Sequence, residues 1–218
     1  MTEEGSTTPR SPLRAVLLAV IAVGLVLLGG GLAVALGIGR DGAATPTSSS
    51  VDAGFARDMA RHHQQGVEMA NLVATRSTDP EVRLLAFDIS STQNNQVGRM
   101  QGWLSLWGLP PTDGPSMAWM GSAHSMTMGP GVLMPGMATD QEMAQLRSVS
   151  GKAFDVQFLR LMIRHHQGGL KMAQYGEEHA SVSAVRTLAR SIAETQTAEV
   201  GTMVQLLTER GGTPLPAP

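Results

Sequence analysis

Most of the chain after residue 50 has apolar residues three or four positions apart, with polar residues between them. This spacing places the apolar side chains on one face of an α-helix. The strict alternation of apolar and polar residues that marks a strand is weak everywhere. The pattern therefore predicts an all-α protein, with long helices over 51–75, 78–107, 152–178 and 182–209 and a short helix over 140–147.

The ends of these helices carry the expected local signals. Asp79 and Pro80 supply a capping side chain and a first-turn proline to the second long helix. Thr139 and Glu142 have the spacing of a capping box, which predicts the start of the short helix. Residues 112–138 are rich in glycine, proline and methionine and have no helical period. We therefore expect an irregular linker between two helical hairpins.

The two hairpins repeat one another. Residues 52–108 align without a gap to residues 155–211, at a shift of 103 positions. The shared residues include the pairs Met59/Met162, His62/His165, His63/His166, Gly66/Gly169 and Met69/Met172. Two homologous hairpins pair most simply about a pseudo-twofold axis, which predicts a four-helix bundle.

The N-terminal segment has a different pattern. Residues 15–38 carry no charge, and as a helix they would extend about 36 Å, enough to cross a bilayer core. Arg10 and Arg14 precede this run, so the positive-inside rule predicts a single-pass membrane protein with an extracytoplasmic C-terminal domain. A cleaved signal peptide is the alternative, because Ala33-Val34-Ala35 resembles a cleavage site, and the domain would then be secreted. The predicted order is a cytoplasmic N-terminus (1–14), an anchor or signal (15–38), a flexible tether (39–50), the helical domain (51–211) and a tail (212–218).

Composition narrows the chemistry of the domain. The net charge is −2, and no basic run indicates nucleic-acid binding. The chain has no cysteine, which excludes disulfides, thiolate metal sites and thiol catalysis. A site for a soft metal ion would therefore use methionine, of which there are 14, and histidine, of which there are six.

Four of these histidines form two repeated His-His pairs, and methionines lie on the same helical faces. Met59 precedes His62 by three residues and Met69 follows it by seven, which places all three along one face. Imidazole suits copper and zinc, whereas a thioether selects Cu(I) or a similar soft ion. The spacing predicts a site for Cu(I) or Cu(II) formed by His62, His63, His165 and His166 and assisted by Met59, Met69, Met162 and Met172. Core packing is the alternative role of these methionines.

The linker contains a second concentration of the same residue types. A loop has no core reason to be rich in methionine, so flexible thioethers around one imidazole predict a separate and weaker Cu(I) site. Its candidate ligands are Met117, Met120, His124, Met126, Met128, Met134 and Met137. The alternative is that the linker packs over the helices, with methionine as an adaptable filler.

Polar residues on the second helix of each hairpin continue the inward-facing rows. Gln93 aligns with Gln196, and Gln96 aligns with Glu199. These side chains are predicted to orient the imidazoles from outside the ligand set, with ordinary helix-face polarity as the alternative. The glycine that both repeats keep four residues after the first histidine is expected to make room for an imidazole or for a neighbouring helix.

The repeated motif resembles a known family. It reads Asp52, Phe55, Met59, His62-His63 and Met69-Ala70, then Asp155, Phe158, Met162, His165-His166 and Met172-Ala173, with Met-Pro-Gly-Met-Ala at 134–138. This pattern closely resembles the bacterial domain-of-unknown-function (DUF) family 305 over about residues 51–211. The resemblance implies a ferritin-like four-helix bundle that is exported or membrane-anchored. Some family members are similar to periplasmic copper-binding proteins that contribute to copper resistance.

These features together predict a copper-binding protein outside the cytoplasm that sequesters or transfers the ion and is not an enzyme. The sequence argues strongly against a di-iron oxidase, because that site needs two Glu-x-x-His motifs and neither His-His pair has a glutamate three residues earlier. A hydrolytic zinc enzyme has weak support, with only Glu68 and Glu199 as acids near the histidines. A structural or pH-sensing ectodomain is the remaining alternative. Because imidazole must lose its proton to bind metal, copper affinity is expected to weaken below about pH 6.

Overall fold

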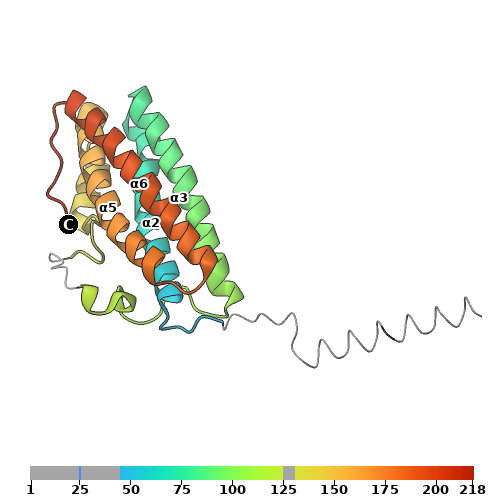
Figure 1. The fold of residues 1–218 in the computed structure, drawn as a ribbon. Helices are drawn as coiled ribbons and strands as arrows, with labels where there is room; N and C mark the ends of the chain where they lie inside the picture. The colour runs from blue at the N-terminus through green and yellow to red at the C-terminus, as the bar shows by residue number, and fades with distance from the viewer. Residues whose placement is uncertain (1–24, 26–44, 125–130) are drawn as a thin grey trace, which may run out of the picture. The chain divides into compact units, whose positions relative to one another are not determined.

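The computed structural model describes Leu25, residues 45–124 and residues 131–218. The predicted anchor or signal at 15–38 therefore lies outside the described residues apart from Leu25, as do Met126 and Met128. No strand occurs in the described part of the chain, which confirms the all-α class. Its helices are α2 (Val51–Arg76), α3 (Pro80–Leu106), η1 (Ala118–His124), α4 (Asp140–Ser148), α5 (Gly151–His179) and α6 (Ser183–Glu209) (Figure 1).

Side chains at the helix starts explain why the helices begin where the sequence indicates. Asp79 accepts hydrogen bonds from Glu81 N and Val82 N at the start of α3, at 3.0 and 3.3 Å. Thr139 and Glu142 form the expected capping box at the start of α4. The linker differs from the prediction, because it contains the 3₁₀ segment η1, which is interrupted at Gly121.

The four long helices pack as two hairpins joined through their first helices. α2 packs along α3, α5 packs along α6, and α2 meets α5 between the two hairpins (Figure 1). α2 and α5 run antiparallel, because Phe55 near the start of α2 touches Gly176 near the end of α5, and His62 lies against Gly169. The repeated residues of the two hairpins therefore face each other near the middle of both helices.

A carboxylate of the first hairpin caps a helix of the second. α6 has no side-chain cap of its own at Val182. Asp52, which is buried at the start of α2, accepts hydrogen bonds from Ser181 N at 3.1 Å and Val182 N at 2.8 Å. Capping by a side chain satisfies amides that the helix itself leaves unpaired. This contact ties the two hairpins together at one end.

The core is divided into two apolar clusters on either side of the repeated histidines. One cluster contains Met59 and Met172, and the other contains Met69 and Met162. In each cluster, one methionine precedes the His-His pair of its repeat and the other follows the His-His pair of the other repeat. This arrangement follows from the antiparallel packing of α2 and α5. None of the helices in the described residues is long and apolar enough to cross a bilayer.

Candidate metal centre

The four repeated histidines lie at the centre of the helical domain. Each of their side chains is fully buried. The rings of His62 and His165 stack across the two hairpins, with centroids 3.9 Å apart and planes tilted by 33°. Within each pair the ring centroids are 6.4 Å apart for His62 and His63, and 6.0 Å apart for His165 and His166. The structure therefore brings the two pairs together, as the repeat predicts.

Backbone carbonyl groups hold the two inner rings. His62 donates from Nε2 to Pro135 O in the linker, at 3.0 Å. His165 donates from Nε2 to His62 O, at 2.9 Å. A carbonyl oxygen can only accept, so the Nε2 atom of each ring carries the proton.

Side chains of the second helices hold the two outer rings. His63 Nε2 lies 2.7 Å from Gln96 Oε1, and His166 Nε2 lies 2.8 Å from Glu199 Oε2. Both partners accept, so these rings also carry their proton on Nε2. Gln96 and Glu199 therefore orient the imidazoles as the repeat alignment predicts.

In all four rings the nitrogen that is left without a hydrogen-bond partner among the described residues is therefore Nδ1. These four Nδ1 atoms are buried. Burial lowers the pKa of His62 to about 4 and that of His63 to about 3, and it lowers the pKa of His165 well below its ordinary value. In these three rings Nδ1 thus keeps a free lone pair at neutral pH, which is the form that binds a metal ion.

The repeated glycines make room for the opposite imidazoles. A Cβ on Gly66 would overlap Gln93 Oε1 and lie 3.0 Å from His165 Cε1. A Cβ on Gly169 would lie 2.8 Å from Gln196 Oε1 and 3.2 Å from His62 Cε1. Gln93 and Gln196 are buried and do not bond the histidines, and in the described part of the chain neither end of their amides has a partner. The glycines and glutamines thus form a polar layer around the inner rings.

The candidate methionines are all buried where the structure describes them. Met59, Met69, Met162 and Met172 have no exposed surface. The linker residues Met117, Met120, Met134 and Met137 are buried in the same apolar cluster as Met59 and Met172. His124 ends η1, and Met126 and Met128 lie outside the described residues. The four described linker methionines therefore pack against one end of the helical site.

The described part of the chain contains no group of three or more histidine, aspartate or glutamate side chains arranged to hold one metal ion. The four imidazoles as placed do not form a single four-nitrogen chelate. What the arrangement offers is free imidazole nitrogens in a buried layer, with thioether clusters on both sides. Mixed nitrogen and thioether ligation of a soft ion is the chemistry that this donor set suits.

A linker turn closes over one side of this layer, and sequence reasoning did not identify it. Gln65 forms two hydrogen bonds with the backbone of Ala138, at 2.9 and 2.7 Å. Gly136 has φ +78° and packs directly against the backbone of α5. The close approach is possible because Gly168 of α5 has no side chain at the point of contact. The repeat counterpart of Gly168 is Gln65, so the linker breaks the pseudo-twofold symmetry. The one signal in the sequence was the second of two adjacent glycines, Gly168-Gly169, inside a helix.

We expect Gly168→Ala to destabilise the protein by about 1–3 kcal/mol, the usual cost of overpacking. The added Cβ would overlap the backbone oxygen of Pro135, so the turn that holds His62 must move. Gly98→Ala is the matched control, because Gly98 lies in α3 with nothing within 4 Å of its Cβ position. The control should stabilise the helix by about 0.5–1 kcal/mol. Urea unfolding of both variants checks this, and equal shifts in the two would contradict the role of the turn.

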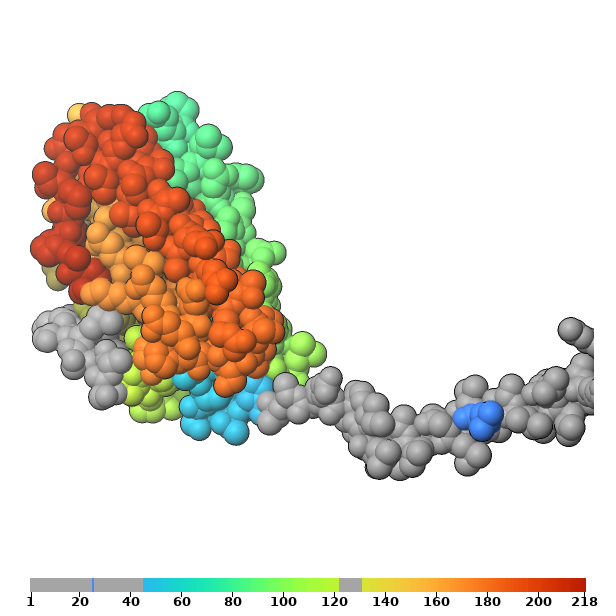
Figure 2. Space-filling view, in the orientation of Figure 1, coloured from blue at the N-terminus to red at the C-terminus, as the bar shows by residue number. Residues whose placement is uncertain are grey.

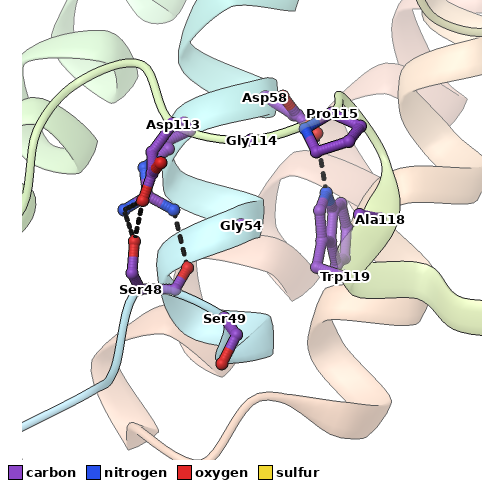
Figure 3. Close-up of a pocket in the computed structure, with 10 residues that line it drawn as sticks. Ser48, Ser49, Gly54, Asp58, Asp113, Gly114, Pro115, Ala118 and Trp119 are labelled. Carbon is purple, nitrogen blue, oxygen red and sulfur yellow. Dashed lines mark hydrogen bonds and ion pairs between the residues drawn. The ribbon is translucent and has the colours of Figure 1, made fainter.

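A separate pocket of about 260 Å³ lies where the linker meets the start of α2 (Figure 3). On one side, Asp58 accepts from Met117 N at 2.6 Å and from Trp119 Nε1 at 2.8 Å. Burial raises the pKa of Asp58 despite these donors. On the other side, Arg57 donates to Ser48 and to Pro110 O. Because Asp58 and Arg57 are already hydrogen-bonded to the linker and to the segment before α2, we interpret them as residues that hold the linker in place and not as metal ligands.

Comparisons with known proteins identify the family and the fold. The family model "Domain of unknown function (DUF305)" matches residues 52–207. The chain is 47% identical to "putative secreted protein DUF305 from Streptomyces coelicolor", over 78% of this chain and 99% of that one, with a TM-score of 0.72. A DUF305 fragment from Deinococcus radiodurans is 34% identical, over 76% and 99% of the two chains, with a TM-score of 0.62. CopM in its Cu(II)-bound form is 27% identical, over 73% and 97%, with a TM-score of 0.58. No curated protein sequence matches the chain.

Proposed function

Because the chain belongs to the DUF305 family, we propose that it binds copper outside the cytoplasm and sequesters or transfers the ion. Its helices would form a ferritin-like four-helix bundle built from the two repeated hairpins. The protein would act as a binding protein and not as an enzyme. The apolar run at 15–38 behind Arg10 and Arg14 supports export, and the name of the Streptomyces coelicolor relative describes a secreted protein.

One observation supports the proposal: the inner atoms of the buried polar layer have no hydrogen-bond partner within residues 45–124 and 131–218. It contains eight such atoms, namely the four histidine Nδ1 atoms and both amide atoms of Gln93 and Gln196. A buried polar atom without a partner costs about 1–3 kcal/mol. Eight of them would cost about 8–24 kcal/mol, as much as or more than the whole stability of a typical domain, about 5–15 kcal/mol. A metal ion that binds the imidazole nitrogens and the amide oxygens would offset part of that cost, whereas the amide NH2 groups can only donate hydrogen bonds.

The donor set favours copper over other ions. Imidazole nitrogen binds both Cu(II) and Cu(I), and the neighbouring thioethers favour Cu(I). The methionines next to the histidines and those of the linker would supply the thioether share, with copper as the partner ion. CopM, whose fold is similar, was solved in a Cu(II)-bound form.

Metal titration of the purified full-length protein tests the proposal. We expect it to retain Cu(I) and Cu(II) after desalting, with Cu(I) measured against a chromophoric competitor. Zn(II) should bind more weakly, because thioethers do not favour it. Folded protein, as judged by circular dichroism, that retains no copper would refute the proposed function.

The alternative function is a pH-sensing ectodomain. The observation that favours it is that burial lowers the pKa of His62 and His63, so both rings would gain charge only with a structural change. This alternative requires no metal. The same titration separates the two, since a pH sensor would show an acid transition and no retained copper.

A further inference from the structure

The two repeats keep identical histidines but hold the outer ones with different chemical groups. The partner stands 33 residues after the histidine in each repeat. His63 donates to the neutral amide of Gln96, whereas His166 donates to the carboxylate of Glu199. The hydrogen-bond geometry is nearly the same, at 2.7 and 2.8 Å. The two partners of the outer rings therefore differ in charge and not in the geometry of the hydrogen bond.

The charges near Gln96 and Glu199 also differ between the two repeats. Gln96 lines an open groove of about 400 Å³ between α3 and α6, together with the cation Arg99. Figure 2 shows these two helices on one face, α3 in green and α6 in orange to red. Arg99 lies over the Trp103 ring, 5.6 Å from its centroid. The repeat counterpart of Arg99 is Thr202, which has no charge. The Gln96 half thus has a nearby cation and the Glu199 half an anion.

A carboxylate that accepts from the Nε2–H of an imidazole raises the electron density on the other ring nitrogen. It also adds a negative charge near an ion that binds there, which favours the more highly charged ion. A neutral amide fixes the ring but does neither. We propose that Glu199 is a positioning residue that makes the His166 half of the site prefer Cu(II), while the Gln96 half binds Cu(II) more weakly. This inference rests on the proposed function.

The two repeats supply their own exchange experiment. Glu199→Gln gives the second half the partner of the first, and Gln96→Glu does the reverse. The double variant, with Glu199→Gln and Gln96→Glu together, again has one amide and one carboxylate, but in exchanged positions. Glu194→Gln is the charge control, because Glu194 is an exposed acid on the same helix that makes no histidine contact. Cu(II) dissociation constants of the full-length protein and its variants are measured by competition, with electron paramagnetic resonance of the bound ion.

We expect Glu199→Gln to weaken the tighter Cu(II) site by about 10- to 100-fold, the usual effect of losing such an outer partner. Gln96→Glu should strengthen the weaker site, and the double variant should return one tight and one weak site. Cu(I) affinity should change less, because the ion carries a single charge. Glu194→Gln should leave Cu(II) affinity within about 3-fold of the parent value, as screened surface charges do.

Metal-free melting curves show whether each variant is folded. If Gln96→Glu does not fold, the comparison of Glu199→Gln with Glu194→Gln still tests the role of Glu199. If the parent binds copper and Glu199→Gln binds Cu(II) with unchanged affinity, the inference is overturned but the proposed function is not. Equal losses in Glu199→Gln and Gln96→Glu would also overturn it, since only fixed geometry would then matter. A parent protein that binds no copper would refute the proposed function itself.

Discussion

A variant with glutamine in place of His62, His63, His165 and His166 is expected to lose Cu(II) binding, with an affinity at least about 100-fold weaker. Cu(II) prefers imidazole nitrogen, and the four buried Nδ1 atoms, which no described group hydrogen-bonds, are the candidate donors. Removing the ligands should cost more than removing their outer partners, which costs about 10- to 100-fold. Glutamine is chosen because it keeps a polar side chain of similar length in this layer. The check is a competition titration with Cu(II) on folded protein.

A second variant tests the candidate thioether ligands of the linker separately. Leucine at Met117, Met120, Met126, Met128, Met134 and Met137 is expected to keep Cu(II) binding and to lose mainly Cu(I) capacity. Methionine-to-leucine changes conserve volume and usually cost less than about 1.5 kcal/mol each. Cu(I) capacity that is unchanged in this variant would show that the linker methionines only fill the core. If the histidine variant and the methionine variant both fold and bind copper like the parent, the metal site is refuted.

Much of the fold could be predicted because its determinants are local. The capping residues Asp79 and Thr139 fix where α3 and α4 begin, and both signals lie within three residues of the helix start. The gapless repeat then predicts two similar hairpins, and α2 and α5 meet at the repeated histidines. The structure of the linker could not be predicted in this way. Its turn at Gly136 is fixed by contact with Gly168 of α5, a long-range relation that leaves only a glycine in the sequence.

The candidate site shows the same division between local and long-range information. The repeat identified the four histidines, because composition and spacing are properties of the sequence. It could not identify the free nitrogen of each ring, since this depends on partners such as Pro135 O and His62 O. The absence of a three-ligand group among the described residues is likewise a matter of side-chain direction. Whether these residues bind copper stays a prediction.

The metal-free protein is expected to lose stability as the pH falls from about 6.5 towards 4. In the unfolded chain a histidine has its ordinary pKa of about 6.5, whereas burial lowers the pKa of His62 to about 4 in the folded protein. Between these values the unfolded state binds the proton and the native state does not, so acid favours unfolding. His62 alone should contribute a loss of about 3 kcal/mol, and His63, whose pKa is lowered further, should add to it.

Urea unfolding at a series of pH values measures this loss, and two features assign it to the histidines. The pKa values of Asp79 and Glu142 are lowered, by the Arg210 and Arg164 side chains that hydrogen-bond them, so their contribution is lost only below their ordinary values of 3.8 and 4.5. His62→Gln should flatten the curve between pH 6.5 and 4, whereas His179→Gln, at a half-exposed position, should not. A free energy of unfolding that is constant between pH 7 and 5 would contradict the buried neutral state.

Copper should extend the stable range to lower pH, because a ligand that binds only the native state stabilises it by mass action. The same burial changes the expected pH dependence of binding. Free imidazole would begin to lose copper below about pH 6, but a buried ring with a pKa of about 4 remains unprotonated well below that value. Copper release on acidification should therefore coincide with unfolding rather than precede it. Simultaneous measurement of bound copper and circular dichroism during an acid titration checks this, and release from protein that is still folded at pH 6 would show that the metal is held by exposed groups instead.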